Sequence, residues 1–178
     1  MYELTPKKTN KTAGKLILLL FLGAAALILI TVAVPPLLKV ELPLRWVFQL
    51  IAIFLLTAGI FLTTRYITKL FIYRVTEKRD LTVTEAASNG KRPITVARVG
   101  LDGIRERIYV DSPAAADAEI KRLKKEKIKL YDYTVDYQPA ESIFLVVVEG
   151  GERLALRLSY DKTLYDLLIP TVNVEEEE

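Results

Sequence analysis

The sequence predicts a membrane α-helical hairpin followed by an α+β domain, and three observations lead to that fold class. The chain has 178 residues, of which 51% are hydrophobic and 26% are charged. Two runs of 19 residues, 16–34 and 46–64, contain no charged residue. Beyond the second run the pattern changes to alternating apolar and polar residues, which is typical of half-buried strands. The segregation of apolar from charged residues predicts one part in lipid and another in water.

Each uncharged run is long enough to cross a bilayer. As a helix, such a run spans about 28 Å, close to the thickness of the hydrocarbon layer. A buried core helix is an alternative, but a helix without a polar face is atypical of soluble domains. A cleaved signal peptide is a second alternative for the first run, because Lys7, Lys8, Lys11 and Lys15 precede it. Against cleavage, Val32-Ala33-Val34 is a poor small-residue cleavage site.

The basic residues predict how the hairpin is oriented. The segment 1–15 reads as a basic tail, and the connector 35–45 carries only Lys39 and Arg45. Five basic residues follow the second run: Arg65, Lys69, Arg74, Lys78 and Arg79. By the positive-inside rule, both termini belong in the cytoplasm of an integral membrane protein of the cell membrane, with 35–45 as the outer loop.

Small residues predict where the two helices touch. In an antiparallel hairpin, Gly23 and Thr57 each lie 7 residues from the cytoplasmic end of their runs. Small side chains let helix backbones approach closely in a membrane. The candidate packing residues are Gly23, Ala24, Thr57 and Gly59.

The segment 65–71 is expected to be an interfacial connector. Arg65 and Lys69 would face headgroup phosphates, and the apolar residues between them would continue a short helix at headgroup level. From about Ile72 the period becomes two, and a domain is expected over 72–170, followed by an acidic tail over 171–178.

The domain is expected to hold about seven strands, a helical insert and a short last helix. Strands are expected from Ile72 and over 81–85, 93–99, 108–110, 128–137, 142–149 and 153–159. Helices are expected over 114–127 and 162–169, with Ser112 and Asp161 as their N-caps. Gly150-Gly151 predicts a hairpin turn, and the run 142–149 is apolar on both faces, which predicts a central strand.

This order of elements resembles bacterial two-pass membrane proteins with a pleckstrin-homology-like (PH-like) cytoplasmic domain. The resemblance covers Phe71 to Ile169, through the stretches FIYRVTEKRDLTVTE, VGLDGIRERI and YDKTLYDLLI. It implies a partly open barrel of about seven strands with a short C-terminal helix. A ferredoxin-like or other α+β sandwich is the alternative.

The residue types argue against a catalytic centre. The chain has no histidine and no cysteine, so the common acid–base, triad and transition-metal ligand sets are missing. No phosphate-binding glycine motif occurs either. Asp132 and Asp136 on one strand would lie about 13 Å apart, too far for a paired-carboxylate mechanism. No enzyme activity, catalytic residue, cofactor or metal site is therefore expected.

Basic side chains are the candidate contact residues of the domain. They are Arg65, Lys69, Lys78, Arg79, Lys121, Arg122, Lys124 and Lys125. They could meet anionic lipid headgroups or a protein partner, or simply be solvated. Nucleic acid is not expected, because interleaved aromatic residues and a groove-reading element are missing.

Two function classes remain. The first is a non-catalytic, membrane-anchored module that recruits or assembles a protein partner at the cytoplasmic face. The second is an accessory subunit of a transporter or export complex that acts through the hairpin.

Overall fold

The computed structural model describes residues 1–9, 11–33, 35, 45–88 and 91–169. The chain folds into two compact units. One unit is the helical segment Lys11–Thr68. The other joins the N-terminal residues to the chain from Lys69 onward, so residues far apart in sequence form one folded unit.

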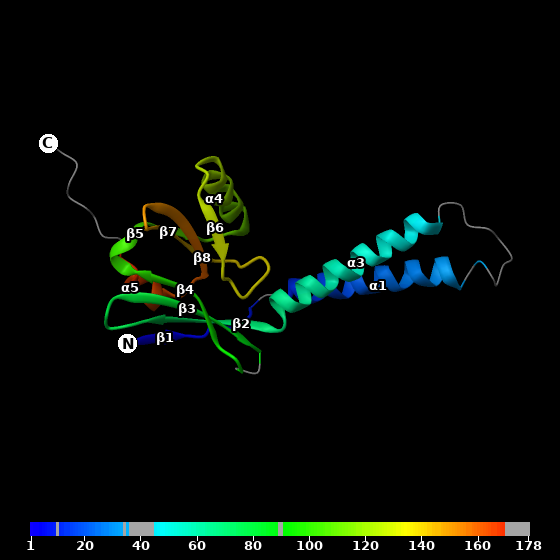
Figure 1. Cartoon of the computed structure of the whole chain (residues 1–178), viewed down its shortest axis with the longest axis horizontal. Helices are drawn as coiled ribbons and strands as arrows, with labels where there is room; N and C mark the ends of the chain where they lie inside the picture. Colours follow the sequence, from blue (N-terminus) through cyan, green and yellow to red (C-terminus); the bar gives the residue numbers. More distant parts are fainter. Residues whose placement is uncertain (10, 34, 36–44, 89–90, 170–178) are drawn as a thin grey trace. The chain divides into compact units, whose positions relative to one another are not determined.

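The helical unit contains α1 (Thr12–Val32) and α3 (Arg45–Tyr66), which lie side by side (Figure 1). Both helices are long and apolar enough to cross a membrane. The two predicted runs fall on these helices, and residues 36–44 of the predicted outer loop lie outside the described part of the chain.

Each helix of this unit has one contact stripe. The buried residues are Ala13, Ile17, Ala24 and Thr31 in α1 and Ala52 and Gly59 in α3, and from Ile17 onward they recur every seven residues. A repeat of seven keeps residues on one face of a helix, where they meet the neighbouring helix. The hydroxyl of buried Thr31 donates to the carbonyl oxygen of Leu27 at 2.8 Å, which satisfies it within its own helix.

The first sheet of the other unit, sheet A, has four antiparallel strands in the described residues. In order across the sheet they are β1 (Tyr2–Leu4), β2 (Lys69–Val75), β3 (Asp80–Ala87) and β4 (Ile94–Gly100). Leu81 and Val83 alternate inward on β3 and are fully buried, as the period of two predicts. The pairing of β3 with β4 shifts register between Val83 and Thr84, which marks a bulge.

The second sheet, sheet B, follows a short 3-10 turn, η1 (Leu101–Gly103). Its strands are β5 (Ile104–Val110), β6 (Lys129–Asp132), β7 (Ser142–Glu149) and β8 (Glu152–Ser159), in the order β5-β7-β8-β6. β6 runs parallel to β8, and the other pairs are antiparallel. Gly150 and Gly151 form the β7–β8 turn with φ of +59° and +86°, a conformation that favours glycine.

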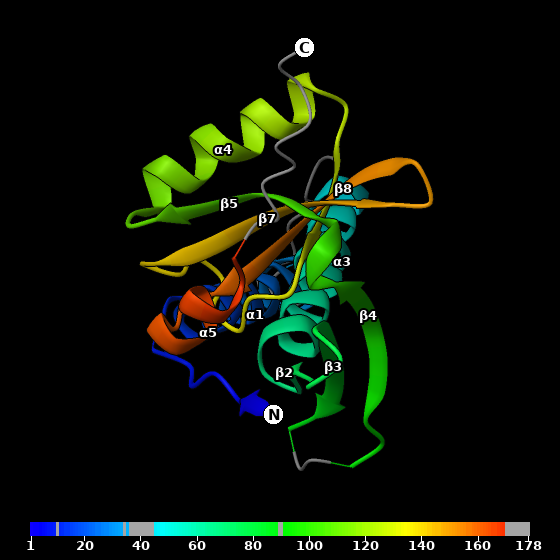
Figure 2. The same ribbon diagram turned by 90° about the vertical axis from the view of Figure 1, so that its left-hand side faces the viewer.

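Sheet B is covered on both faces, which explains the apolar sequence of β7. Ile143, Leu145 and Val147 lie in the core shared with sheet A, whereas Phe144 and Val146 lie in a second core. Helix α4 (Pro113–Lys125) covers that second core (Figure 2). The short helix α5 (Lys162–Leu167) lies beside the first core, to which it contributes Leu164.

The predicted N-caps Ser112 and Asp161 are confirmed. Ser112 Oγ accepts the N–H of Ala115 at 3.3 Å, and Asp161 Oδ1 accepts the N–H of Leu164 at 2.9 Å. Each cap thus satisfies a backbone donor that the first turn of its helix leaves unpaired.

The α+β class is confirmed, but the domain differs from the prediction in its strands. The seven predicted strands correspond to β2–β8, and β1 is an eighth within the described residues. The strands form two separate four-stranded sheets and no closed barrel among the described residues. The basic tail predicted over 1–15 therefore contains a strand, and the tail predicted over 171–178 lies outside the described residues.

Two further boundaries are corrected. The predicted connector 65–71 is not an interfacial helix, because α3 ends at Tyr66 and β2 begins at Lys69. The predicted strand 128–137 is cut short, because β6 ends at Asp132. The carboxylate of Asp132 accepts the N–H of Thr134 at 2.9 Å, and this local turn replaces strand pairing.

Candidate functional site: surfaces of the folded unit

An N-terminal arm, residues 1–9, is held to the folded unit by polar side chains. The hydroxyl of Tyr2 donates to Asp161 Oδ1 at 2.7 Å. At the other end of the arm, the N–H and hydroxyl of Thr9 donate to Asp136 Oδ2 at 3.1 and 2.8 Å. Asp136 is only 5% exposed, so these two bonds help to satisfy a buried carboxylate. In its first residues the arm also pairs with β2 through the backbone, with Leu4 opposite Tyr73.

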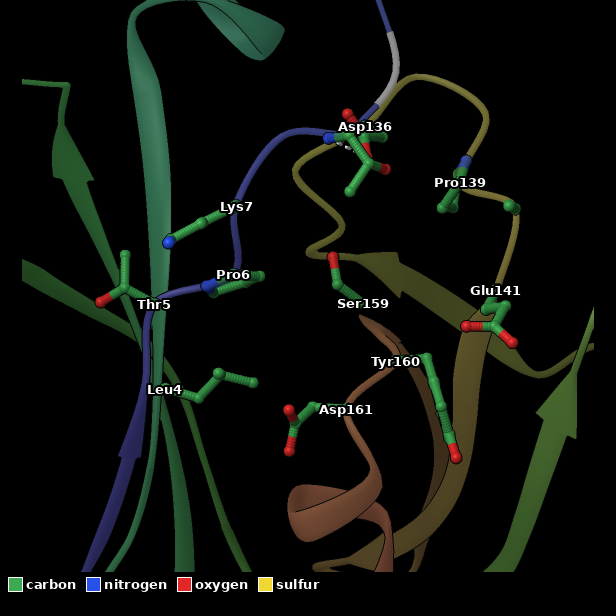
Figure 3. Close-up of a pocket in the computed structure, with 12 residues that line it drawn as sticks. Leu4, Thr5, Pro6, Lys7, Asp136, Pro139, Glu141, Ser159, Tyr160 and Asp161 are labelled. Atoms are coloured by element: carbon green, nitrogen blue, oxygen red, sulfur yellow. Dashed lines mark hydrogen bonds between the residues drawn. The ribbon is translucent and has the colours of Figure 1, made fainter.

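A cavity of about 520 Å³ lies between this arm, the loop before β7 and the residues that lead into α5. Figure 3 shows Leu4 of the arm and Asp161 on facing walls, with Glu141 and Tyr160 further along. Prolines line the cavity from both sides, Pro6 from the arm and Pro139 from the loop.

Two of the carboxylates that line this cavity are engaged within the unit. Burial tends to raise the pKa of Asp161, but hydrogen bonds from Leu164, Tyr2 and Thr163 outweigh it and lower that pKa. The hydroxyl of Tyr109 donates to Glu141, and this bond raises the pKa of Tyr109 to about 12. The acidic groups of the cavity are thus bonded to residues of the same unit, and two of these bonds hold the arm in place.

A second groove, of about 300 Å³, lies between β4 and the end of sheet B. Its walls are Val96–Val99 of β4 on one side and Tyr131, Tyr133 and Leu154 on the other. The rings of Tyr131 and Tyr133 are stacked, with planes 5° apart and centroids 6.4 Å apart. The hydroxyl of Tyr133 donates to the carbonyl oxygen of Val96 at 3.3 Å and bridges the groove. We call this groove the β4–β6 seam.

The predicted basic residues of α4 separate into two kinds. Arg122 is engaged with three carboxylates, at 2.7 Å from Glu106, 2.7 Å from Glu119 and 3.0 Å from Glu126. The other three, Lys121, Lys124 and Lys125, are exposed and form no ion pair within the described part of the chain. The structure thus removes Arg122 from the predicted contact surface, because its charge fastens the helix to sheet B.

The other predicted basic residues lie on elements other than α4. Lys69 lies on β2, 2.7 Å from Glu85. Lys78 and Arg79 are exposed in the β2–β3 turn, where Arg79 has φ of +58° and lies 3.9 Å from Asp102. Arg65 belongs to the helical unit, with its guanidinium 4.9 Å from the ring of Tyr66.

The predicted small residues differ in how closely they pack between α1 and α3. A Cβ at Gly23 would lie 3.5 Å from Leu55, and a Cβ at Gly59 would lie 3.2 Å from the ring of Phe21. Ala24 is fully buried, whereas Thr57 is exposed and its hydroxyl donates to the carbonyl of Ile53 at 2.9 Å.

Sequence reasoning missed the arm and the edge position of β4. The hydrogen bonds of Tyr2 and Thr9 reveal the arm, and their partners lie 159 and 127 residues away. No sequence signal marks β4 as an edge, because Ile94 and Val96 read as ordinary strand residues although both are exposed. Among the described residues, no group of three or more acidic side chains is placed to hold a metal ion.

Known proteins provide no assignment for either unit. No family model, curated protein or solved structure matches the chain.

Proposed function

We propose that this chain is a non-catalytic, membrane-anchored interaction module that recruits or assembles a protein partner at the cytoplasmic membrane face. In this proposal α1 and α3 cross the bilayer, and the other unit is a PH-like domain. The seven strands β2–β8 followed by α5 support the PH-like assignment. The lysine and arginine distribution supports the cytoplasmic orientation.

One observation carries the proposal: the helical hairpin is inserted between two neighbouring strands of one sheet. β1 precedes α1 along the chain, α3 precedes β2, and β1 pairs with β2. A hairpin that crosses the membrane twice returns the chain to its starting side, as this pairing requires. The folded unit is thereby attached at two points, which suits a domain that holds a partner at a surface.

The exposed threonine hydroxyls of the helices are the first polar groups to consider for a partner site on the hairpin. The hydroxyls of Thr57 and Thr64 are exposed, but each donates to a carbonyl of its own helix at 2.9 Å. Polar side chains that bond across helices are a common means of association in membranes, and these two are already satisfied. The accessory-subunit alternative would have to rest on apolar packing and on the amide of Gln49 in α3.

A hairpin exchange tests the proposal. The segment 11–68 is replaced by an unrelated two-helix hairpin, and both proteins are purified in mild detergent with their cross-linked partners identified by mass spectrometry. Retention of the same partners supports the interaction module. Loss of those partners with the native hairpin would overturn it in favour of the accessory subunit.

A further inference from the structure

The β4–β6 seam separates two unpaired strand edges. β4 ends sheet A and β6 ends sheet B in the described residues, and residues of both strands line the same groove. An unpaired edge offers backbone N–H and C=O groups to any strand that can reach it.

The backbone bonds show which groups of β4 are offered. The N–H of Leu101 donates to the carbonyl of Arg79 at 2.7 Å, in line with the register of Asp80 opposite Gly100. Antiparallel pairs alternate between bonded and non-bonded, so Val99 and Ala97 point their backbone groups at β3. The backbone groups of Arg98 and Gly100 therefore point away from β3, toward the edge, whereas the carbonyl of Val96 on the same strand already accepts the hydroxyl of Tyr133 at 3.3 Å.

The side chains around this edge suit an extended peptide. Val96 and Ile94 are 36% and 64% exposed, and the stacked rings of Tyr131 and Tyr133 form the opposite wall. A groove of about 300 Å³ has room for a few side chains of a single strand.

Charged residues of opposite sign lie near the two ends of β4. Arg92 precedes β4, is exposed and forms no ion pair with any described residue. Glu149 lines the seam near Val99 and is likewise exposed, without an ion pair in the part of the chain that the structure describes. A strand antiparallel to β4 would begin near Glu149 and end near Arg92.

We infer that the seam binds an extended segment of a partner protein as an added antiparallel strand on β4. The segment has alternating apolar residues that face Tyr131 and Tyr133, a basic residue at its start beside Glu149, and an acidic residue at its end beside Arg92. Backbone bonds provide the affinity, and the two charges select the direction. This inference rests on the proposed function, since it names the surface that the partner uses.

The test uses the full chain in nanodiscs and two fluorescent, end-blocked peptides, KVTVTVE and EVTVTVK. Fluorescence anisotropy should show about tenfold preference for KVTVTVE, because EVTVTVK either places like charges together or must run parallel to β4 and give up the antiparallel pairing. The double variant Arg92→Glu with Glu149→Lys should prefer EVTVTVK instead. An unchanged preference in that variant would overturn the inference.

A matched pair of variants tests the edge itself. Arg98→Pro removes an N–H that points away from β3, whereas Arg98→Ala removes only the side chain and its ion pair with Asp80. Peptide binding should be lost in the first and kept in the second, with both melting normally. If Arg98→Pro unfolds, wild-type protein is tested with KVTVTVE N-methylated at its valines or at its threonines. Only one of the two methylated peptides should then bind, and equal binding of both would overturn strand addition.

Two results would overturn peptide binding at the seam and leave the proposed function intact. One is no binding of either peptide when partners still copurify after the hairpin exchange. The other is a dimeric chain that Arg98→Pro makes monomeric without any peptide binding, which would assign the edge to a second copy.

Discussion

Arg122 and the lysines near it share one helix but have different surroundings. The side chain of Glu119 is only 12% exposed and lies 2.7 Å from the guanidinium of Arg122. Glu106 adds a contact from β5, so the arginine joins α4 to sheet B. If the charges of Arg122 and the lysines were reversed together, loss of the ion pairs that hold α4 to sheet B could not be separated from loss of surface charge.

Arg122→Ala should lower the free energy of unfolding by about 1 kcal/mol, because it removes the ion-pair partner of Glu119, whereas Glu106 and Glu126 keep Arg153 at 3.3 and 3.6 Å. Lys124→Ala is the matched control and should change it by less than about 0.5 kcal/mol. Chemical denaturation of the full chain in detergent measures both. Equal effects would show that the ion pairs of Arg122 add no stability.

Ionisation of Tyr2 at high pH should weaken the attachment of the arm to the folded unit. Burial, followed by the hydrogen bond to Asp161, raises the pKa of Tyr2 to about 12 from 10.0. Because the pKa is higher in the folded state, Tyr2 contributes its full stabilisation of the fold below pH 10.0. That contribution is lost as the pH rises toward about 12. Tyr2→Phe should therefore be less stable at neutral pH and lose less on going from about pH 9 to about pH 12.

Melting curves at several pH values, with tyrosinate absorbance recorded in parallel, check this prediction. Tyr109→Phe serves as a comparison, because Tyr109 also has its pKa raised to about 12 but lies outside the arm. Parallel pH profiles for wild type and Tyr2→Phe would contradict it.

At the scale of elements, α1 and α3 make one tight contact. A Cβ at Gly59 would press on the ring of Phe21, whereas a Cβ at Gly14 would meet nothing within 4 Å. Gly59→Leu should lower thermal stability in detergent by an amount on the order of 1 kcal/mol, typical of packing within membranes. Gly14→Leu should leave it unchanged, and similar melting of the two variants would show that this contact is not important.

The arm is an element that the rest of its unit should need. Residues 69–169 are compared with a fusion in which residues 1–9 are joined to them by a flexible linker in place of the hairpin. The arm should raise the free energy of unfolding by about 2 kcal/mol, because β1 pairing and the bonds of Tyr2 and Thr9 each contribute about 0.5–1.5 kcal/mol before ordering costs.

The control fusion carries Tyr2→Ala, Glu3→Ala and Thr9→Ala, which keeps the chain length but removes the side-chain bonds, including the bond of Arg74 to Glu3 at 2.7 Å. Urea denaturation followed by circular dichroism should place it between the other two proteins, because the backbone pairing of β1 and the N–H of residue 9 remain. Equal stability of all three proteins would mean that the arm is only loosely associated.

Short-range sequence patterns predicted most helices, strands and turns. The features that were not predicted depend on contacts between residues far apart in the chain. The caps Ser112 and Asp161 and the Gly150-Gly151 turn act within three or four residues, so the sequence alone reveals them. β1 has three residues, too few for a period of two to be recognised. The bond of Arg122 with Glu106 spans 16 residues and depends on how α4 packs on β5. The seam likewise depends on sheet order, which side-chain periodicity does not encode.

At the scale of the whole molecule, the pairing of β1 with β2 constrains the topology of the hairpin. If both helices cross the membrane, the arm and the chain from Lys69 onward must be on one side. The lysines of the arm and the basic residues after α3 predict that this side is the cytoplasm. The connector between the helices would then be outside.

Single cysteines test this arrangement cleanly, because the chain has no native cysteine. Glu41→Cys lies in the connector by sequence, and Glu77→Cys replaces a side chain that is 88% exposed in the β2–β3 turn. A membrane-impermeant thiol reagent on intact cells should label Glu41→Cys alone, and both variants after permeabilisation. Labelling of Glu77→Cys alone in intact cells would reverse the orientation and place the folded unit outside. Equal labelling of both in intact cells would mean that the two helices do not separate these positions across a membrane, and the anchored-module proposal would fail with it.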